Sequence, residues 1–227
     1  MATFKVEHSE GMRWVRVALD GDEVRTERGA LNHMQGAITM DVPWPTLRAW
    51  WVSLFSDETT LRPRYSGTGT VSLDSSLGGY HLMNVTAGER WVLDTRCFWA
   101  SDRKIQLSIH RERMLTALWA GEGLFWYKTA LKGEGQVVLS VPGPVHEVAL
   151  DNDRLITDGP FVVARTHGIS MQIKRPVKSL LSYWLSGQKR AYVYEGTGKL
   201  LLCAVPYWRA RMQKERMGMA IAGWDSE

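Results

Sequence analysis

Basic and aromatic side chains are mixed in one stretch near the end of the sequence, YWRARMQKER at 207–216. Aromatic rings can stack on bases while arginine and lysine contact phosphates, so this composition suits single-stranded nucleic acid. The residues that would make these contacts are Tyr207, Trp208, Arg209, Arg211 and Lys214. Short charged tails are more often solvated helices. A basic C-terminal tail over 207–227 is therefore the favoured interpretation, and binding of RNA or single-stranded nucleic acid is the alternative.

Large apolar side chains recur at helical spacing over residues 45–55, and Pro45 suits the first turn of a helix. Trp50, Trp51 and Phe55 belong to this short helix and form a predicted interface. Such a face packs against a sheet or a neighbouring subunit, or it lies on a membrane surface as part of a peripheral scaffold. The sequence favours packing, and the membrane surface is kept as an alternative partner.

Side chains that could do metal or covalent chemistry are scattered along the chain. The six histidines form no His-x-His pair and have no glutamate at ligand spacing, which argues against a metal site. There is no Gly-x-Ser-x-Gly motif for a nucleophile. Neighbouring carboxylates such as Asp151 and Asp153 stand in turn-rich sequence, where aspartate is common. We therefore predict that the protein is not an enzyme and has no catalytic residues, metal or cofactor, and the sequence identifies no small-molecule ligand.

The composition is that of an ordinary globular protein of 227 residues. Hydrophobic residues make up 44% and charged residues 23% of the chain, and the formal net charge is +4. Positive and negative side chains are interspersed, so this charge does not require a nucleic-acid partner. Cys97 and Cys203 stand in apolar, strand-like sequence, which predicts buried thiols in a reducing compartment. With no signal-peptide core and no window long enough to span a bilayer, a cytoplasmic location is expected.

A Gly-x-Gly motif followed by apolar residues at alternating positions occurs three times at regular intervals. Two glycines separated by one residue on a strand permit the close approach of a neighbouring backbone. A phosphate-binding loop would need a following helix N-terminus and a Lys-Ser/Thr pair, and neither is found there. We therefore predict a structural role for the six glycines, which are Gly67, Gly69, Gly133, Gly135, Gly196 and Gly198.

Apolar and polar residues alternate through most of the chain, which predicts an all-β fold. The repeats predict that residues 1–222 form one compact body of three similar β-units in a pseudo-threefold arrangement, as β-sandwich units or a double-stranded β-helix. The predicted units are 45–112, 113–177 and a third formed jointly by 178–206 and 1–40.

A unit shared between the two ends of the chain requires these ends to meet, because otherwise sheet edges would stay open. We therefore expect the N-terminal strands to lie beside residues 190–205. A few short linker helices are also predicted, over 45–55, 111–121 and 174–185.

The stretches ERGALNHMQGAITM, AGEGLFWYKTALKGEGQVVLSVPGPVHEVAL and DGPFVVARTHGISM resemble the mitochondrial-biogenesis AIM-twenty-four family. The matching features are Gly29 with Ala30, Gly121 to Phe125, Gly133 to Leu139, and Pro142 with Gly143, and the resemblance covers about residues 1–210. It implies a fold similar to the tryptophan RNA-binding attenuator protein, a double-stranded β-helix of repeated units. The segment 41–65 departs from the family pattern, where a glycine-rich loop is common.

The matching motifs belong to the scaffold, so the resemblance says little about chemistry. Together with the tryptophan-rich composition and the expected sheet edges, it predicts a binding or assembly module of poorly defined role that forms a homo-oligomer.

Overall fold

All regular structure in the described part of the chain is β-strand. The computed structural model describes residues 2–43, 62–76, 78–111, 127–174 and 191–203. The predicted helix over 45–55 lies outside these residues, as do the other two predicted helices apart from Arg111 and Lys174, which end strands. The all-β prediction is confirmed.

Fourteen strands are described, and they form two antiparallel sheets. In chain order they are β1 (Thr3–Ser9), β2 (Met12–Thr26), β3 (Leu31–Asp41), β4 (Arg64–Ser76), β5 (Tyr80–Val85), β6 (Arg90–Leu93), β7 (Phe98–Asp102), β8 (Gln106–Arg111), β9 (Tyr127–Lys132), β10 (Gly135–Ser140), β11 (Val145–Thr157), β12 (Val162–Thr166), β13 (Ile169–Lys174) and β14 (Ala191–Cys203). The first sheet has the order β3-β4-β2-β7-β10-β5, with β1 also paired to β2. The second has the order β11-β14-β12-β6-β9-β8, with β13 also paired to β14.

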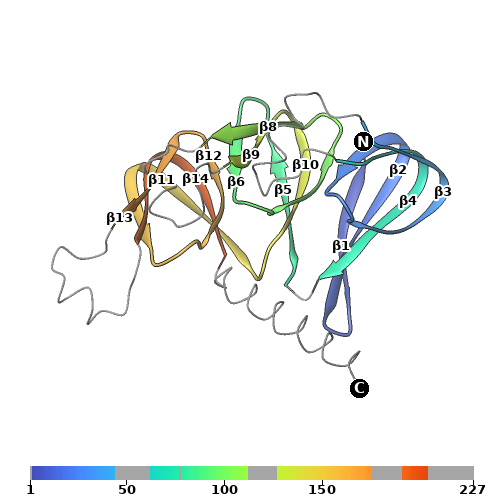
Figure 1. Ribbon diagram of the computed structural model, residues 1–227, viewed down its shortest axis with the longest axis horizontal. Helices are drawn as coiled ribbons and strands as arrows, with labels where there is room; N and C mark the ends of the chain where they lie inside the picture. Colours follow the sequence, from blue (N-terminus) through green and yellow to red (C-terminus); the bar gives the residue numbers. More distant parts are fainter. Residues whose placement is uncertain (1, 44–61, 77, 112–126, 175–190, 204–227) are drawn as a thin grey trace, which may run out of the picture.

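The strands lie in three groups placed side by side (Figure 1). The N-terminal group is β1–β4, the middle group is β5–β10, and the C-terminal group is β11–β14. The first sheet consists of the N-terminal group with β5, β7 and β10, and the second consists of the C-terminal group with β6, β8 and β9. The middle group is therefore shared by both sheets and links the outer groups.

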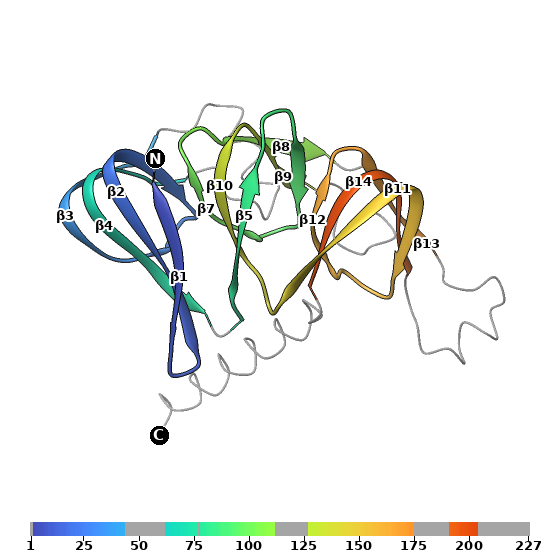
Figure 2. The ribbon, with the colours of Figure 1, turned by 180° about the vertical axis from the view of Figure 1, so that it is seen from behind.

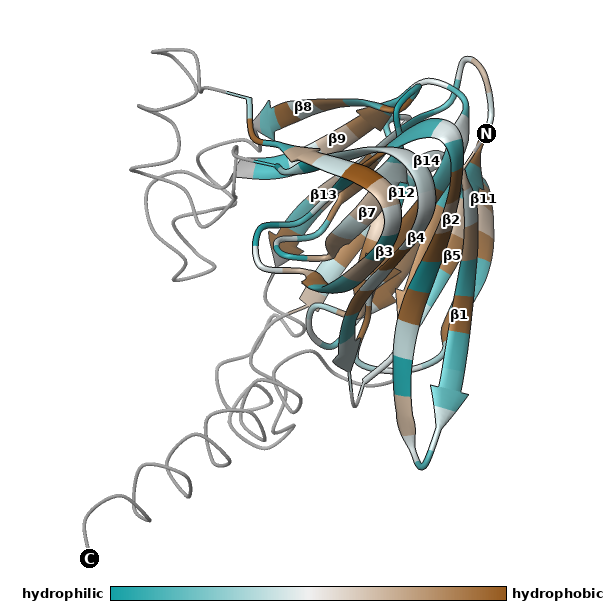
Figure 3. Ribbon diagram, turned by 90° about the vertical axis from the view of Figure 1, so that its right-hand side faces the viewer, coloured by the Kyte–Doolittle hydropathy of each residue, from teal (hydrophilic) through white to brown (hydrophobic). Residues whose placement is uncertain are grey.

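Alternation of side chains along the strands explains how the sheets bury one face. In β2, Val15, Val17 and Leu19 are buried, while the residues between them are exposed. Successive side chains of a strand point to opposite faces, so this pattern places one apolar row inside. Figure 3 shows the same alternation of hydrophobic and hydrophilic residues along the strands of the N-terminal group.

The hydrophobic core consists of three clusters, and two of them cross the boundaries between groups. The cluster of the N-terminal group also takes in Tyr80, Ala100 and Val138 from the middle group. The cluster of the middle group takes in Val163 and Leu201 from the C-terminal group. The third cluster lies within the C-terminal group. Cys97 and Cys203 are both buried thiols, as predicted.

The expected meeting of the two ends of the chain is wrong. The strands of residues 3–41 pair with one another, with β4 and with β7, whereas β14 pairs with β11, β12 and β13. Figures 1 and 2 place these two sets of strands at opposite ends of the molecule. The physical reason is that β4 supplies the N-terminal group with a glycine-bearing strand of its own. No third unit is therefore built jointly from 178–206 and 1–40 in the described strands.

Candidate assembly interface

Three pairs of glycines lie where a neighbouring segment passes a strand at close range. Their φ angles are 126° to 138° at the first glycine of each pair and 150° to 152° at the second. A Cβ built on the first glycine would collide with a backbone carbonyl oxygen, and one on the second with a carbonyl oxygen or a side chain. The first glycines, Gly67, Gly133 and Gly196, face Ala37, Lys104 and Gly168, and the second ones, Gly69, Gly135 and Gly198, face Gln35, Asp102 and Thr166. Such φ values and crowding leave room for glycine alone.

β2 and β7 meet in a short antiparallel ladder, here called the first junction, that joins the N-terminal and middle groups. Its opposed pairs are Val24–Asp102, Arg25–Ser101 and Thr26–Ala100. A hydrogen bond of 2.7 Å from the Glu27 N–H to the carbonyl of Trp99 prolongs the ladder. Val24, Thr26, Ala100 and Ser101 are all fully buried. The junction therefore lies inside the molecule.

β6 and β12 form the second junction, which joins the middle and C-terminal groups. Its opposed pairs are Trp91–Thr166, Val92–Arg165 and Leu93–Ala164. The Asp94 N–H donates a hydrogen bond of 2.8 Å to the carbonyl of Val163. Val92 and Arg165, the middle pair, are 2% and 5% exposed. The second junction thus has the same ladder and the same prolonging hydrogen bond as the first.

Each junction also contains a cation paired with the carboxylate that follows the ladder. Arg62 lies 3.5 Å from Glu27 at the first junction, and Lys128 lies 2.9 Å from Asp94 at the second. Both cations make a further contact across the boundary between groups. Arg62 donates a hydrogen bond of 2.9 Å to the Thr129 hydroxyl, and the Lys128 Nζ lies 3.9 Å from the Met171 sulfur.

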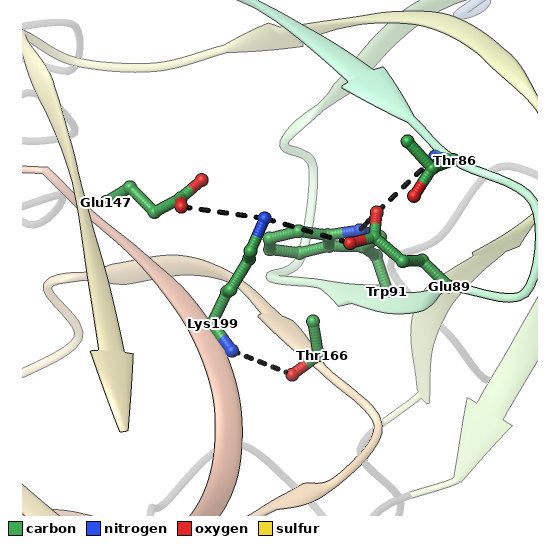
Figure 4. Close-up of polar contacts among 6 residues, drawn as sticks. All are labelled: Thr86, Glu89, Trp91, Glu147, Thr166 and Lys199. Carbon is green, nitrogen blue, oxygen red and sulfur yellow. Dashed lines mark hydrogen bonds and ion pairs between the residues drawn. The ribbon is translucent and has the colours of Figure 1, made fainter. Parts of the chain in front are cut away.

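A second polar cluster links the middle group to the C-terminal group through ion pairs and hydrogen bonds (Figure 4). The Lys199 Nζ lies 3.8 Å from a Glu89 carboxylate oxygen and 3.7 Å from one of Glu147. Glu89 also accepts hydrogen bonds from the Trp91 indole N–H, at 3.3 Å, and from the Thr86 backbone N–H, at 3.4 Å. Burial works to raise the pKa of Glu89, but these hydrogen bonds and the Lys199 charge together lower it.

Asp102 is a buried carboxylate at the first junction. Its Oδ2 accepts a hydrogen bond of 2.7 Å from the Gln136 backbone N–H. Burial raises the pKa of Asp102, and the Gln136 hydrogen bond opposes this effect without cancelling it. Because this hydrogen bond joins β7 and β10, the Asp102 carboxylate helps to hold these two strands together.

The histidines and carboxylates of the described residues do not gather into a metal-binding group. No set of three or more His, Cys, Asp or Glu side chains suited to a metal ion is found among the described residues. His110 and His167 have their rings 5.7 Å apart in an edge-to-face contact. Burial lowers the pKa of His81, and the nearby Glu147 charge opposes this effect.

Large hydrophobic side chains are exposed at the ends of the sheets. They are Met34, Met40, Val42, Ile109 and Ile156. Met34 and Met40 lie on β3, which ends the first sheet, and Val42 follows that strand directly. Ile156 lies on β11 and Ile109 on β8, the two end strands of the second sheet. Sequence reasoning missed these residues, because an apolar residue in an alternating strand gives no sign of standing at a sheet end.

The residues predicted from the sequence fall into two sets. The six repeat glycines are described above, in three matching settings. The predicted nucleic-acid contacts Tyr207, Trp208, Arg209, Arg211 and Lys214 lie outside the described residues, and so do the predicted interface residues Trp50, Trp51 and Phe55. No helix in the described ranges is long and apolar enough to span a membrane.

Comparison with known proteins identifies the family and the fold. The sequence matches the family described as mitochondrial biogenesis AIM24 over residues 4–205. The structure is similar to the crystal structure of a protein from Streptococcus pyogenes, with a TM-score of 0.71, 17% sequence identity, and coverage of 96% of this chain and 100% of the other. No curated protein matches the sequence. At 17% identity the structural similarity bears on the fold alone. The family match spans most of the chain, and the protein therefore belongs to the mitochondrial biogenesis AIM24 family.

Proposed function

We propose that the protein is a non-enzymatic assembly module, built from three similar β-units, that self-associates through the ends of its sheets. The observation that carries the proposal is the location of its exposed large hydrophobic side chains. All five that are exposed in the described residues lie on β3, β8 and β11 or directly after β3. Each of these strands ends a sheet.

Support for three similar units comes from contacts that recur at equal distances from the glycine pairs. The residue five positions after the second glycine donates its N–H to a backbone carbonyl in each group. The three hydrogen bonds run from Asp74 to Ala30 at 2.7 Å, from Ser140 to Cys97 at 2.8 Å and from Cys203 to Phe161 at 2.8 Å. A pseudo-threefold arrangement of such units, with the attenuator-like double-stranded β-helix that the family resemblance implies, accounts for this recurrence.

Support for association through sheet ends comes from the sequence of β3. Edge strands of soluble proteins are usually short or protected by lysine, proline or inward-pointing charges. β3 has 11 residues, LNHMQGAITMD, with no lysine or proline and with Asp41 as its single formal charge. Met34 and Met40 are 45% and 52% exposed along it. A long, nearly uncharged and apolar edge is suited to pairing with another strand.

The mass of the full chain in solution tests this proposal. We expect light scattering coupled to size-exclusion chromatography to give a mass above that of one chain, rising with concentration. A Met34→Lys/Met40→Lys variant should shift the equilibrium toward single chains, because it places charge on the exposed edge. A wild-type mass of one chain up to the solubility limit would refute self-association.

Two alternative partners stay predictions, because the residues that would contact them lie outside the described ranges. Nucleic-acid binding by the basic tail predicts a salt-sensitive affinity that is lost in an Arg209→Ala/Arg211→Ala variant in filter binding. Attachment to a membrane surface through Trp50, Trp51 and Phe55 predicts co-sedimentation with liposomes. A cytoplasmic location is likewise part of the proposal.

A further inference from the structure

The ladder residues of both junctions stand in a fixed register with the glycine-bearing strands. The residue two positions before the first glycine lies opposite the start of the ladder: Tyr65 opposite Val24, and Leu131 opposite Trp91. In the C-terminal group the same position is Tyr194, and it lies opposite Leu155. Residues 155–157 therefore stand where 24–26 and 91–93 stand in the other groups. Residues 155–157 are therefore equivalent to the ladder residues that one strand contributes to each junction.

The second strand of each junction, β7 or β12, can also be located relative to the glycine pairs. The second glycine of each pair is crowded by the last residue of the junction strand, Asp102 for Gly135 and Thr166 for Gly198. In the N-terminal group Gly69 is crowded by Gln35. Residues 33–35 therefore stand where 100–102 and 164–166 stand at the two junctions.

These two half-junctions lie at opposite ends of the molecule (Figures 1 and 2). Within the described residues β11 pairs with β14 alone and β3 with β4 alone. Met34 is 45% exposed, whereas its counterparts Ser101 and Arg165 are 0% and 5% exposed. Ile156 is 53% exposed, whereas its counterpart Val92 is 2% exposed. Arg25, the other counterpart of Ile156, is half-buried. The position of Met34 is thus buried at both junctions and that of Ile156 is buried or half-buried, whereas both are exposed at the two ends.

We infer that β11 of one copy pairs with β3 of a second copy and so repeats the internal junction between molecules. The inference rests on the proposed self-association and specifies which surfaces meet. Transferring the internal register sets Leu155 opposite Gln35, Ile156 opposite Met34 and Thr157 opposite His33, in antiparallel strands. The Asp158 N–H then donates to the Asn32 carbonyl, as Glu27 and Asp94 donate to Trp99 and Val163.

The chemistry of the two strands suits this contact. Directly opposed residues of antiparallel strands lie close enough for their side chains to touch. The pairing therefore brings together Ile156 and Met34, which are exposed hydrophobic residues in the single chain. Residues 33–35 and 155–157 include no aspartate, glutamate, lysine or arginine. No like-charged pair opposes the contact.

The contact joins unlike surfaces, so its assembly differs from a two-fold dimer. Each copy offers one β3 and one β11, and both can be occupied at the same time. Addition of copies therefore continues into a ring or an open filament, depending on the rotation at each step. Because the two strands are at opposite ends of one chain, a single copy cannot satisfy both by itself.

Two variants that each block one half of the contact test the inference. Met34→Lys blocks β3 and Ile156→Lys blocks β11; both substitutions are at exposed positions, and the two blocked strands carry like charges that repel each other in a mixture. We expect each purified variant to have the mass of one chain at a concentration where the wild type is associated. An equimolar mixture should double this mass, because an intact β11 of the first variant meets an intact β3 of the second, and addition then stops.

The other outcomes show whether the pairing of β3 with β11 fails alone or whether self-association fails as well. If one variant keeps the wild-type mass while the other loses it, like strands pair, and the inference fails although self-association stands. The inference also fails if both variants keep the wild-type mass, or if the mixture stays at one chain. A wild type that is a single chain at all concentrations overturns both.

Two controls test whether the substitutions disturb folding or change association in a nonspecific way. Unfolding midpoints of the variants should match that of the wild type, and Met34→Ser replaces Met34→Lys if they differ. Ile109→Lys adds the same charge at a 42% exposed position on β8, which takes no part in the contact. This variant should associate like the wild type, and its loss of association would place the interface at β8 and contradict the inference.

Discussion

The outer groups place matching residues in opposite environments. Ile38 lies opposite Gly67 and Met40 opposite Tyr65, just as Ile169 lies opposite Gly196 and Met171 opposite Tyr194. Ile169 and Met171 are 0% and 6% exposed, whereas Ile38 is half-buried and Met40 is 52% exposed.

The difference shows that the neighbouring group decides burial. Met171 lies against Lys128 of β9, a strand of the middle group. Met40 lies on a strand that ends its sheet. Equivalent residues are thus part of the core where a neighbouring group packs against them and part of the surface where none does among the described strands.

Loss of the buried ion pair at the second junction should have the largest effect. Lys128→Ala removes the partner from the Asp94 carboxylate, whose side chain is 15% exposed, and a largely buried charge left in this way typically costs about 3–5 kcal/mol of unfolding free energy. Lys199→Ala is the matched control, because its ion pairs are exposed and such pairs contribute at most about 1 kcal/mol. Urea unfolding measures both, and similar small losses would mean that the junction is not a buried contact.

Substitution of a repeat glycine should come next. Gly67→Ala places a Cβ against the Ala37 carbonyl at a φ of 132°, so we expect a loss of about 3 kcal/mol. Gly88→Ala provides the comparison, since Gly88 also has a positive φ, 92°, but open space around it. It should lose about 1 kcal/mol. Equal losses in thermal unfolding would show that close approach is unimportant at Gly67.

Truncation of the two matching methionines, Met171 and Met40, tests whether their burial differs as described. Met171→Ala should cost about 2 kcal/mol or more, as expected for a buried methionine, whereas Met40→Ala should change the stability of the single chain by less than about 0.5 kcal/mol. Both values are obtained from urea unfolding at low protein concentration. Equal costs would contradict the opposite environments of these residues.

A change of pH should have the smallest effect. Burial lowers the pKa of His81 below its usual 6.5, so the folded state favours the neutral ring. Its contribution to stability is therefore present above the unfolded pKa and is lost as the pH falls below about 6.5. We expect His81→Gln to flatten the fall in melting temperature between neutral pH and pH of about 5. A variant whose profile parallels the wild type throughout this range would count against the role of His81.

Part of this structure could be predicted from residue spacing. Alternation along GQVVLSV and similar stretches correctly indicated strands, and the glycine pairs indicated places where only glycine has room. These features are local, because a strand face and a crowded φ depend on the residues beside them. The family could also be identified, because its motifs belong to the scaffold.

The way in which the groups connect could not be predicted. Similarity between the segments at 22–40 and 153–171 shows that they play the same part, but not that they complete the same unit. The exposure of Met34 and Ile156 was also hidden, since their counterparts Ser101 and Val92 are buried by strands remote in sequence. Burial at these positions depends on which strand comes next in the sheet.

Cross-linking of single cysteines tests the intermolecular junction most directly. A Met34→Cys chain is mixed with an Ile156→Cys chain of different mass, and a short thiol cross-linker is added, while the native Cys97 and Cys203 are buried and serve as background in the wild type. We expect covalent dimers that contain one chain of each kind. Cross-links between like chains, or none above the wild-type background at a concentration where the protein is associated, would contradict it.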